Sequence, residues 1–290
     1  MQRDMYLYLH DQTLRLLNQG YTGAEIAEML ELPPALERQW HTHGYYGSVS
    51  HNVKAIYKRY MGWYDGNPAN LWPHPPEAAA GRYVDAMGGR DAALAVARKA
   101  WEDDDYRWCV EVGKHLVFAD DADREASDLL ADAFEQLGYG AENGTWRNTY
   151  LAGATELRDG SFGTPVGAGP DLLGALTVPQ VFDSVAIRID GPRAWDHNLQ
   201  IVWVIADENT TYLVELRNGA LHHRTVSEPP PGVTAFTLTR RALIGLVTGT
   251  LDLASALGDG TVVVNGDPEI LERLVALLAP VDPDFDIVTP

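Results

Sequence analysis

Hydrophobic positions recur at helical spacing through the first half of the chain. The first run covers residues 1–19 and consists of Tyr6, Leu9, Thr13, Leu16 and Leu17. Gly20 ends this run, and the capping-box residues Thr22 and Glu25 predict that a short helix follows. Five more helices are expected over residues 77–87, 91–102, 106–118, 123–137 and 146–157. No strand pattern precedes residue 160, so this half is predicted to be all-α, and residues 131–154 resemble tetratricopeptide helix pairs.

The hydrophobic pattern changes period in the second half. Apolar runs of strand length occur at residues 199–205, 211–216, 221–226, 235–238 and 262–264. Asn218 and Gly219 separate two of these runs and are the strongest hairpin signal in the chain. Helices are expected over residues 179–189, 241–247 and 268–278, the second of them capped by Thr239. These elements predict an α+β domain in which helices cover an antiparallel sheet of four or five strands.

A glycine-rich stretch, residues 160–169, separates the two patterns and has the composition of a linker. A length of 290 residues exceeds one typical core and fits two domains. We therefore expect a multidomain chain with an all-α domain at residues 1–160, a linker at 161–170 and an α+β domain at 171–290.

Aromatic and histidine residues gather in residues 41–72, which hold three of the nine histidines and five of the thirteen tyrosines. Ser48 or Ser50 can cap a helix that Gly62 ends, with Trp63 and Tyr64 in the loop that follows. The apolar stripe of this helix is Val49, Val53, Ile56, Tyr57 and Tyr60. Helix packing does not require so many aromatic residues in the flanking loops, and we interpret the stretch as one wall of a site.

Composition excludes several classes of function. The net charge of −19 disfavours binding to nucleic acid or to an anionic membrane surface, because both need a basic face. The lone cysteine, Cys109, lies in an apolar helical context typical of a small buried hydrophobe, and it excludes an internal disulfide. No run reaches the roughly 18 apolar residues of a membrane helix, and the charged N-terminus does not have the pattern of a signal peptide.

No set of catalytic or metal-ligating residues is complete. His41 and His43 can project together from an extended segment, but a metal site needs further ligands and none follows at a suitable spacing. His222 and His223 lie on a predicted strand and point to opposite faces. Acidic runs at residues 103–105 and 120–123 are interpreted as solvated helix starts. The sequence contains no nucleophile elbow, phosphate loop or zinc-protease helix.

Long strings nevertheless resemble a known family. The strings HDQTLRLLNQGYTGAEIAE, HTHGYYGSVSHNVKAIYKRYMGWYDGNPANLWPHPP and LADAFEQLGYGAENGTWRNTYLAGATELRDG are similar to the dimerisation domain of bacterial alkyl sulfatases. These enzymes are the SDS-hydrolase group of the metallo-β-lactamase superfamily. Residues 186–290 resemble their C-terminal, sterol-carrier-like domain. The resemblance implies a soluble bacterial homodimer that acts on long-chain alkyl sulfate esters or other amphiphiles.

The chain departs from that family in one respect. Family members carry a zinc domain with a His-x-His-x-Asp-His motif, whereas His41-Thr-His43 is followed by Gly44 and Tyr45. The resemblance therefore predicts that the zinc ions belong to a domain outside this chain and that the chain alone is inactive. Three explanations fit this departure: the chain is a fragment, a truncated reading frame, or a partner of a separate zinc-domain subunit. The uncapped first helix is consistent with each of them.

The resemblance also suggests roles for particular residues. By position, His51 would donate to a sulfate oxygen or assist proton transfer to the leaving group. Trp63 would supply an N–H donor, and Tyr45, Tyr46 and Tyr64 are further candidates to contact substrate; packing between helices is the alternative for each. The candidates to line a cavity for the aliphatic tail are Phe182, Leu199, Ile201, Trp203, Leu216, Leu243 and Leu246. Each of these also fits an ordinary core. A free-standing lipid-binding protein and a purely structural dimer module remain the alternative functions.

Overall fold

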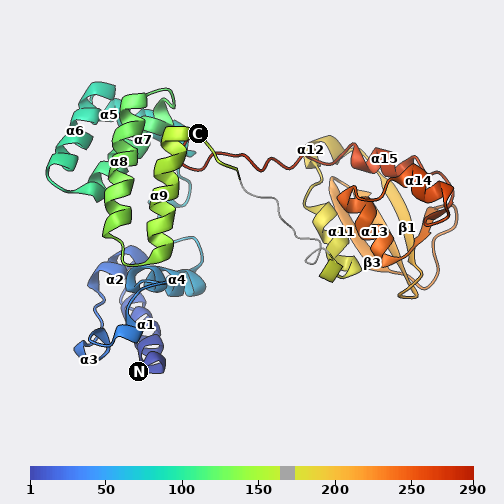
Figure 1. The fold of residues 1–290 in the computed structure, drawn as a ribbon, viewed down its shortest axis with the longest axis horizontal. Coiled ribbons are helices and arrows are strands. Elements are labelled where there is room, and N and C mark those ends of the chain that lie inside the picture. Colours follow the sequence, from blue (N-terminus) through green and yellow to red (C-terminus); the bar gives the residue numbers. More distant parts are fainter. Residues whose placement is uncertain (164–173) are drawn as a thin grey trace. The chain divides into compact units, whose positions relative to one another are not determined.

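The computed structural model describes residues 1–163 and 174–290, and the chain forms two compact units (Figure 1). Unit 1 contains residues 1–163 together with residues 284–290, and unit 2 contains residues 164–283. Most of the expected linker lies outside the described residues.

The described part of unit 1 has helices and no strands, which confirms the all-α prediction for the first half. Its helices are α1 (Gln2–Leu17), α2 (Gly23–Met29), α3 (Pro34–Glu37), η1 (Trp40–Thr42), α4 (Val49–Met61), η2 (Pro68–Asn70), α5 (Pro76–Ala86), α6 (Arg90–Glu102), α7 (Tyr106–Ala119), α8 (Arg124–Gly140) and α9 (Gly144–Asp159). The capping box expected at Thr22 and Glu25 is present at the start of α2.

Two hydrophobic cores hold unit 1 together. Helices α1, α2 and α4 meet around Leu9, Ile26 and Val53, whose side chains are buried. Helices α5 to α9 pack around a second core, in which Cys109 and Leu130 are buried. In Figure 1 the α1–α4 group lies at one end of the long helices α8 and α9. The turn between α8 and α9 therefore lies beside the start of α4.

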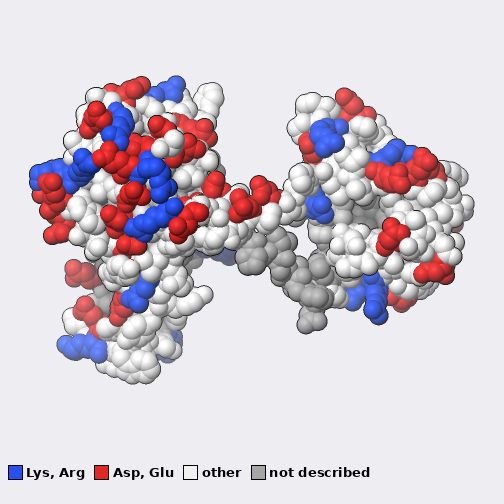
Figure 2. Space-filling view, turned by 45° about the horizontal axis from the view of Figure 1, so that its top comes forward, with Lys and Arg blue, Asp and Glu red and all other residues white. Residues whose placement is uncertain are grey.

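Acidic residues at helix starts serve as caps. The carboxylate of Asp105 accepts a hydrogen bond from the Trp108 N–H at the start of α7, and Asp123 accepts one from Ala126 N–H in α8. Asp123 also receives two hydrogen bonds from Arg90, whose guanidinium contacts Glu125 as well. Figure 2 shows basic side chains interspersed with acidic ones on one face of unit 1. The acidic runs thus lie at helix starts, as the sequence suggested, but Asp123 is paired with Arg90 and is not solvated as expected.

The last residues of the chain pack on unit 1, although the sequence placed them in the second domain. The buried carboxylate of Glu156 in α9 accepts hydrogen bonds from the N–H groups of Ile287, at 2.6 Å, and Val288, at 2.8 Å. The Val288 side chain packs against the α5–α9 core. We call residues 284–290 the tail. Local patterns did not indicate this return, because it depends on a single buried acceptor far away in the sequence.

Unit 2 is an α+β domain built on one five-stranded sheet. Its strands are β1 (Leu199–Ile205), β2 (Thr210–Arg217), β3 (Ala220–Thr225), β4 (Thr234–Leu238) and β5 (Val263–Asn265). Its described helices are α11 (Val178–Ala186), α12 (Gly191–Ala194), α13 (Arg240–Thr248), α14 (Leu253–Gly258) and α15 (Ile270–Val275). Helices α11 and α13 lie over one face of the sheet in Figure 1. The short helices α12 and α14 were not expected, because neither has room for a helical hydrophobic repeat.

The strand order β3-β2-β1-β4-β5 corrects the expectation of an antiparallel sheet. Strand β4 pairs in parallel with β1, and the other pairs are antiparallel. Strand β2 already occupies one edge of β1, so β4 joins the other edge after a connection from β3. The predicted hairpin between β2 and β3 is confirmed, since Asn218 and Gly219 both have the positive φ angles of a tight hairpin turn, 53° and 72°.

Candidate functional site

The segment that joins α3 to α4 forms one side of the site. It passes through η1, turns at residues 43–48 and enters α4. The Ser48 hydroxyl caps α4 by accepting a hydrogen bond from His51 N–H at 3.1 Å, so Ser48 and not Ser50 is the cap. Gly62 ends the helix with a φ of 74°, which favours glycine. These local features hold His51 in the first turn of α4.

The start of α9 holds this segment by its backbone. Gly144 N–H donates to the carbonyl of Tyr45 at 2.8 Å, and the Thr145 hydroxyl donates to the carbonyl of Tyr46 at 2.8 Å. The carbonyl groups of Tyr45 and Tyr46 are thus both held by the first turn of α9. Because the carbonyls are held, the turn that carries both tyrosine side chains has a defined position.

His43 is bound at both ring nitrogens. Its Nε2 lies 2.9 Å from the Glu37 carbonyl, and its Nδ1 lies 3.1 Å from the Glu142 carboxylate. Both partners are acceptors, so the two contacts are best satisfied when both nitrogens carry a proton. The hydrogen bond with Glu142 is the largest cause that raises the pKa of His43, and the Glu37 carbonyl also raises it. His43 therefore joins α3 to the α8–α9 turn through contacts that favour its imidazolium form, and neither ring nitrogen is free to bind a metal.

His51 contacts a different kind of partner. Its Nδ1 lies 3.0 Å from the indole Nε1–H of Trp146 in α9, and the two rings meet edge to face. The Lys54 ammonium lies over the same indole, 5.4 Å from the ring centroid. The side chains of His51 and Lys54 are exposed. Residues from α4 and α9, far apart in the sequence, therefore form one cluster.

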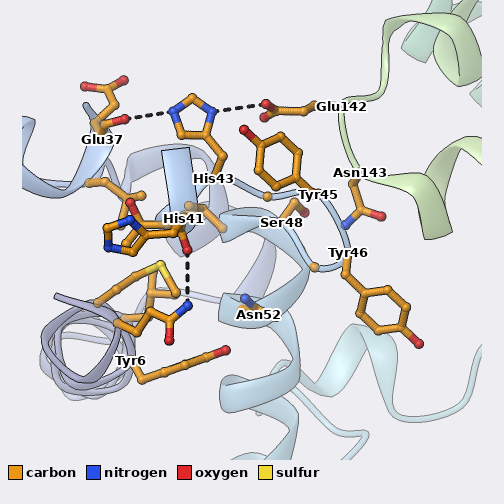
Figure 3. A pocket seen from close by; sticks show the side chains of 18 of the residues that line it. Tyr6, Glu37, His41, His43, Tyr45, Tyr46, Ser48, Asn52, Glu142 and Asn143 are labelled. Carbon is orange, nitrogen blue, oxygen red and sulfur yellow. Dashed lines mark hydrogen bonds and ion pairs between the residues drawn. The ribbon is translucent and has the colours of Figure 1, made fainter. Parts of the chain in front are cut away.

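A pocket of about 720 Å³ lies beside these contacts (Figure 3). Its apolar side includes Met5 and Leu9 of α1 together with Leu32 and Val49. Its polar lining is Gln2, Tyr6, Glu37, His41, Thr42, His43, Tyr45, Tyr46, Ser48, Asn52, Glu142 and Asn143. In Figure 3 Tyr45 lies beside His43, whereas the Tyr46 side chain points away from the other labelled residues. The pocket lining therefore combines apolar and polar groups.

Asn143 is buried at the junction between the two segments. Its Oδ1 caps α9 by accepting hydrogen bonds from Trp146 N–H, at 2.9 Å, and from the Thr145 hydroxyl. Among the residues that the structure describes, its buried donor Nδ2 has no hydrogen-bond partner. The sequence patterns did not single out Asn143, although the preference for Asn as the residue that caps a helix was a signal that could have identified it.

The structure brings some of the predicted residues together and separates others. Tyr45, Tyr46 and His51 lie around the start of α9, and Tyr46 is 82% exposed. Trp63 is 73% exposed and lies with Tyr64 beyond the other end of α4, their rings 5.6 Å apart. At about 1.5 Å per residue the two ends of α4 are roughly 18 Å apart. Trp63 and Tyr64 therefore do not form a cluster with His51.

The residues expected to line a lipid cavity belong to the core of unit 2. Five of them, Phe182, Ile201, Trp203, Leu216 and Leu243, are buried, and Leu199 and Leu246 pack against them. Aromatic contacts connect this core: the Trp203 ring stacks on Phe236 at 5.2 Å, and Phe182 lies 6.0 Å from Trp203. These side chains contact one another, as a packed core requires.

The described residues do not supply a zinc site. Over residues 1–163 and 174–290, no group of three or more His, Cys, Asp or Glu side chains is placed to hold a metal ion. His222 and His223 have separate partners, Glu215 and Asp183. Within the same residues no helix is long and apolar enough to cross a membrane.

Comparisons with known proteins match both units. A family model for alkyl sulfatase dimerisation matches residues 22–160, and one for the alkyl sulfatase C-terminal region matches residues 167–290. An (R)-specific secondary-alkylsulfatase from Pseudomonas is 46% identical over 100% of this chain and 44% of its own length. An alkyl/aryl-sulfatase from Saccharomyces cerevisiae is 42% identical over 100% of this chain and 45% of its own length.

A solved structure agrees with these matches. The stereoselective inverting sec-alkylsulfatase of Pseudomonas aligns with a TM-score of 0.91 and 44% identity over 99% of this chain and 46% of that one. The chain therefore spans less than half the length of these relatives. The two family models together cover nearly all of the sequence, and their order along the chain is that of units 1 and 2. The chain belongs to the alkyl sulfatase family, of which it carries the dimerisation and C-terminal regions.

Proposed function

We propose that this chain is the C-terminal portion of a zinc-dependent enzyme that hydrolyses long-chain alkyl sulfate esters. The two zinc ions and the water that they activate belong to a domain outside these 290 residues. Within the chain, unit 1 holds a homodimer and closes one wall of the active site, and unit 2 captures the amphiphile. The observation that carries the proposal is the composite wall built from the α3–α4 segment and the start of α9.

The wall offers groups suited to a sulfate ester. His51 and Lys54 present an N–H donor and a cation from one face of α4, and the exposed Tyr46 lies in the turn that precedes this helix. Donors of this kind stabilise negative charge on oxygen, which grows at the leaving group when the ester bond breaks. In this proposal His51 touches the substrate, and Tyr45 and Tyr46 complete the contact surface.

An assay of hydrolysis by the chain alone tests whether catalysis requires the zinc domain. Purified chain with added zinc and dodecyl sulfate should release no sulfate above background, because the described residues hold no metal site. The control is the same assay with a zinc-domain subunit supplied separately, which should restore turnover if the two parts assemble. Turnover by the chain alone would contradict the proposal.

Dimerisation is the second proposed role. Tetratricopeptide-like packing of the helix pair α8 and α9 would present a regular face to a second copy. Light scattering at micromolar concentration should give twice the chain mass of 31.9 kDa. A monomer at that concentration would remove this role.

Amphiphile capture by unit 2 is the third role, and it follows from the resemblance to sterol-carrier domains. The aliphatic tail would enter between the sheet and helices α11 and α13, where the apolar residues gather. Trp203 lies in that core and its fluorescence should change when a long-chain alcohol or fatty acid is titrated into the chain. Titration of Trp203→Phe should lose that change while the remaining tryptophans report the pocket of unit 1. No change in either protein would contradict capture.

A further inference from the structure

The contact between His51 and Trp146 fixes which nitrogen of the histidine carries its proton. An indole Nε1–H can only donate a hydrogen bond. At 3.0 Å from that donor, His51 Nδ1 must accept and is therefore unprotonated. In the neutral ring the proton is then on Nε2. The contact with Trp146 on α9 therefore selects one tautomer of the neutral His51 ring.

Trp146 is itself held in place. Its backbone N–H donates to Asn143 Oδ1 at the start of α9, and its side chain is half-buried between the two helices. The Lys54 ammonium lies over its ring, three residues along α4 from His51. Two side chains from one face of α4 therefore contact a single indole, one at its N–H edge and one at its face. This arrangement restricts the ring of His51 as well as its tautomer.

We propose that Trp146 is a positioning residue that makes His51 a hydrogen-bond donor through Nε2–H toward an anionic sulfate oxygen. This inference rests on the proposed function and narrows it. Of the two roles that the sequence suggested for His51, donation to oxygen is the one that this tautomer performs. Proton transfer to the leaving group needs the imidazolium, which is a far stronger acid than the neutral ring, whereas neutral Nε2–H can donate a hydrogen bond to oxygen.

The tautomer can be measured directly in the chain. In protein labelled with ¹⁵N at histidine, two-bond ¹H–¹⁵N correlations distinguish protonated from unprotonated ring nitrogens, and His51→Gln assigns the signals. Neutral His51 should show a protonated Nε2 and an unprotonated Nδ1. Trp146→Phe removes the donor and keeps an aromatic ring under Lys54, so both tautomers should become populated. Trp108→Phe, at an exposed tryptophan of α7, is the matched control and should leave His51 unchanged.

Ligand binding separates this inference from the proposed function. Methyl sulfate titrated into the chain should shift the His51 signals, and Trp146→Phe should weaken that binding by about tenfold, the effect of one hydrogen bond to a charged group. A protonated Nδ1 in the wild-type chain, or a tautomer balance that Trp146→Phe does not change, would overturn the positioning role. A changed tautomer balance with no methyl sulfate binding in either protein would support positioning and contradict the sulfate contact of the proposed function.

Discussion

The two histidines His43 and His51 lie eight positions apart and have opposite hydrogen-bonding surroundings. The ring nitrogens of His43 face a carbonyl and a carboxylate, whereas Nδ1 of His51 faces an N–H donor. The first arrangement favours the imidazolium, and the second decides which nitrogen of the neutral ring carries the proton. Residue type is therefore a poor guide to the role of either histidine, and the partners decide it.

A pH-dependent stability is expected from His43. Its folded-state pKa is raised by the hydrogen bond with Glu142, so this contribution is complete below the unfolded value of about 6.5 and is lost as the pH rises through the folded value. Glu142→Gln should lower the melting temperature of unit 1 at about pH 5.5, and the difference from wild type should shrink by about pH 9. In a His43→Asn background the same change should have no pH-dependent effect; a constant difference in both backgrounds would contradict the ion pair.

The thiol of Cys109 should be inert in the folded chain. It is fully buried in the α5–α9 core, and this burial raises its pKa to about 11. Because the thiolate is the reactive species, a thiol reagent at neutral pH should label Cys109 only as fast as unit 1 opens. Labelling followed by mass spectrometry should be slow in buffer and rapid in denaturant. Rapid labelling of the native chain would show that this core is open.

At the scale of secondary structure elements, the site depends on two helix starts that face each other. Ser48 caps α4 and Asn143 caps α9, and the first turns of both helices carry the residues of the wall. Fraying of the α9 start would release its contacts with Tyr45, Tyr46 and His51, and fraying of the α4 start would release the contact with His51. Capping is thus a local feature with a consequence for the whole candidate site.

The cap of α4 can be tested with two neighbouring serines. Ser48→Ala removes the acceptor of His51 N–H and should cost about 1 kcal/mol of the free energy of unfolding of unit 1. Ser50→Ala is the matched control, because Ser50 lies inside the first turn, where alanine is the better helix former. Denaturant unfolding of both variants measures the difference. An equal loss in both would mean that the hydroxyl of Ser48 is not the cap.

At the scale of the whole molecule, unit 2 is inserted into unit 1. The chain leaves unit 1 after residue 163 and returns to it at residue 284. Within unit 1, the Ser161 hydroxyl donates a hydrogen bond to the carbonyl of Phe285. This bond joins the segment that leaves unit 1 to the segment that returns to it. The two segments of unit 1 that flank unit 2 in the sequence are therefore in contact.

Removal of the tail should weaken unit 1 more than unit 2. The carboxylate of Glu156 is 7% exposed and would lose both of its backbone donors. A chain that ends at residue 283 should show an earlier melting transition for unit 1, and Glu156→Gln in the intact chain should cost about 2 kcal/mol, the value of a buried hydrogen bond to a charged group. Asp159→Asn at the exposed end of α9 is the control. An unchanged first transition in both variants would contradict this role of the tail.

The sequence by itself determined the helices of unit 1, the hairpin at Asn218 and Gly219 and the caps at Thr22 and Thr239, because each depends on residues a few positions apart. It also determined the family. Tertiary structure alone decided the parallel pairing of β4 with β1, the return of the tail to Glu156 and the contact of Trp146 with His51. Each of these joins segments distant in the sequence, and a local pattern contains no information about which distant partner will satisfy a buried or half-buried polar group.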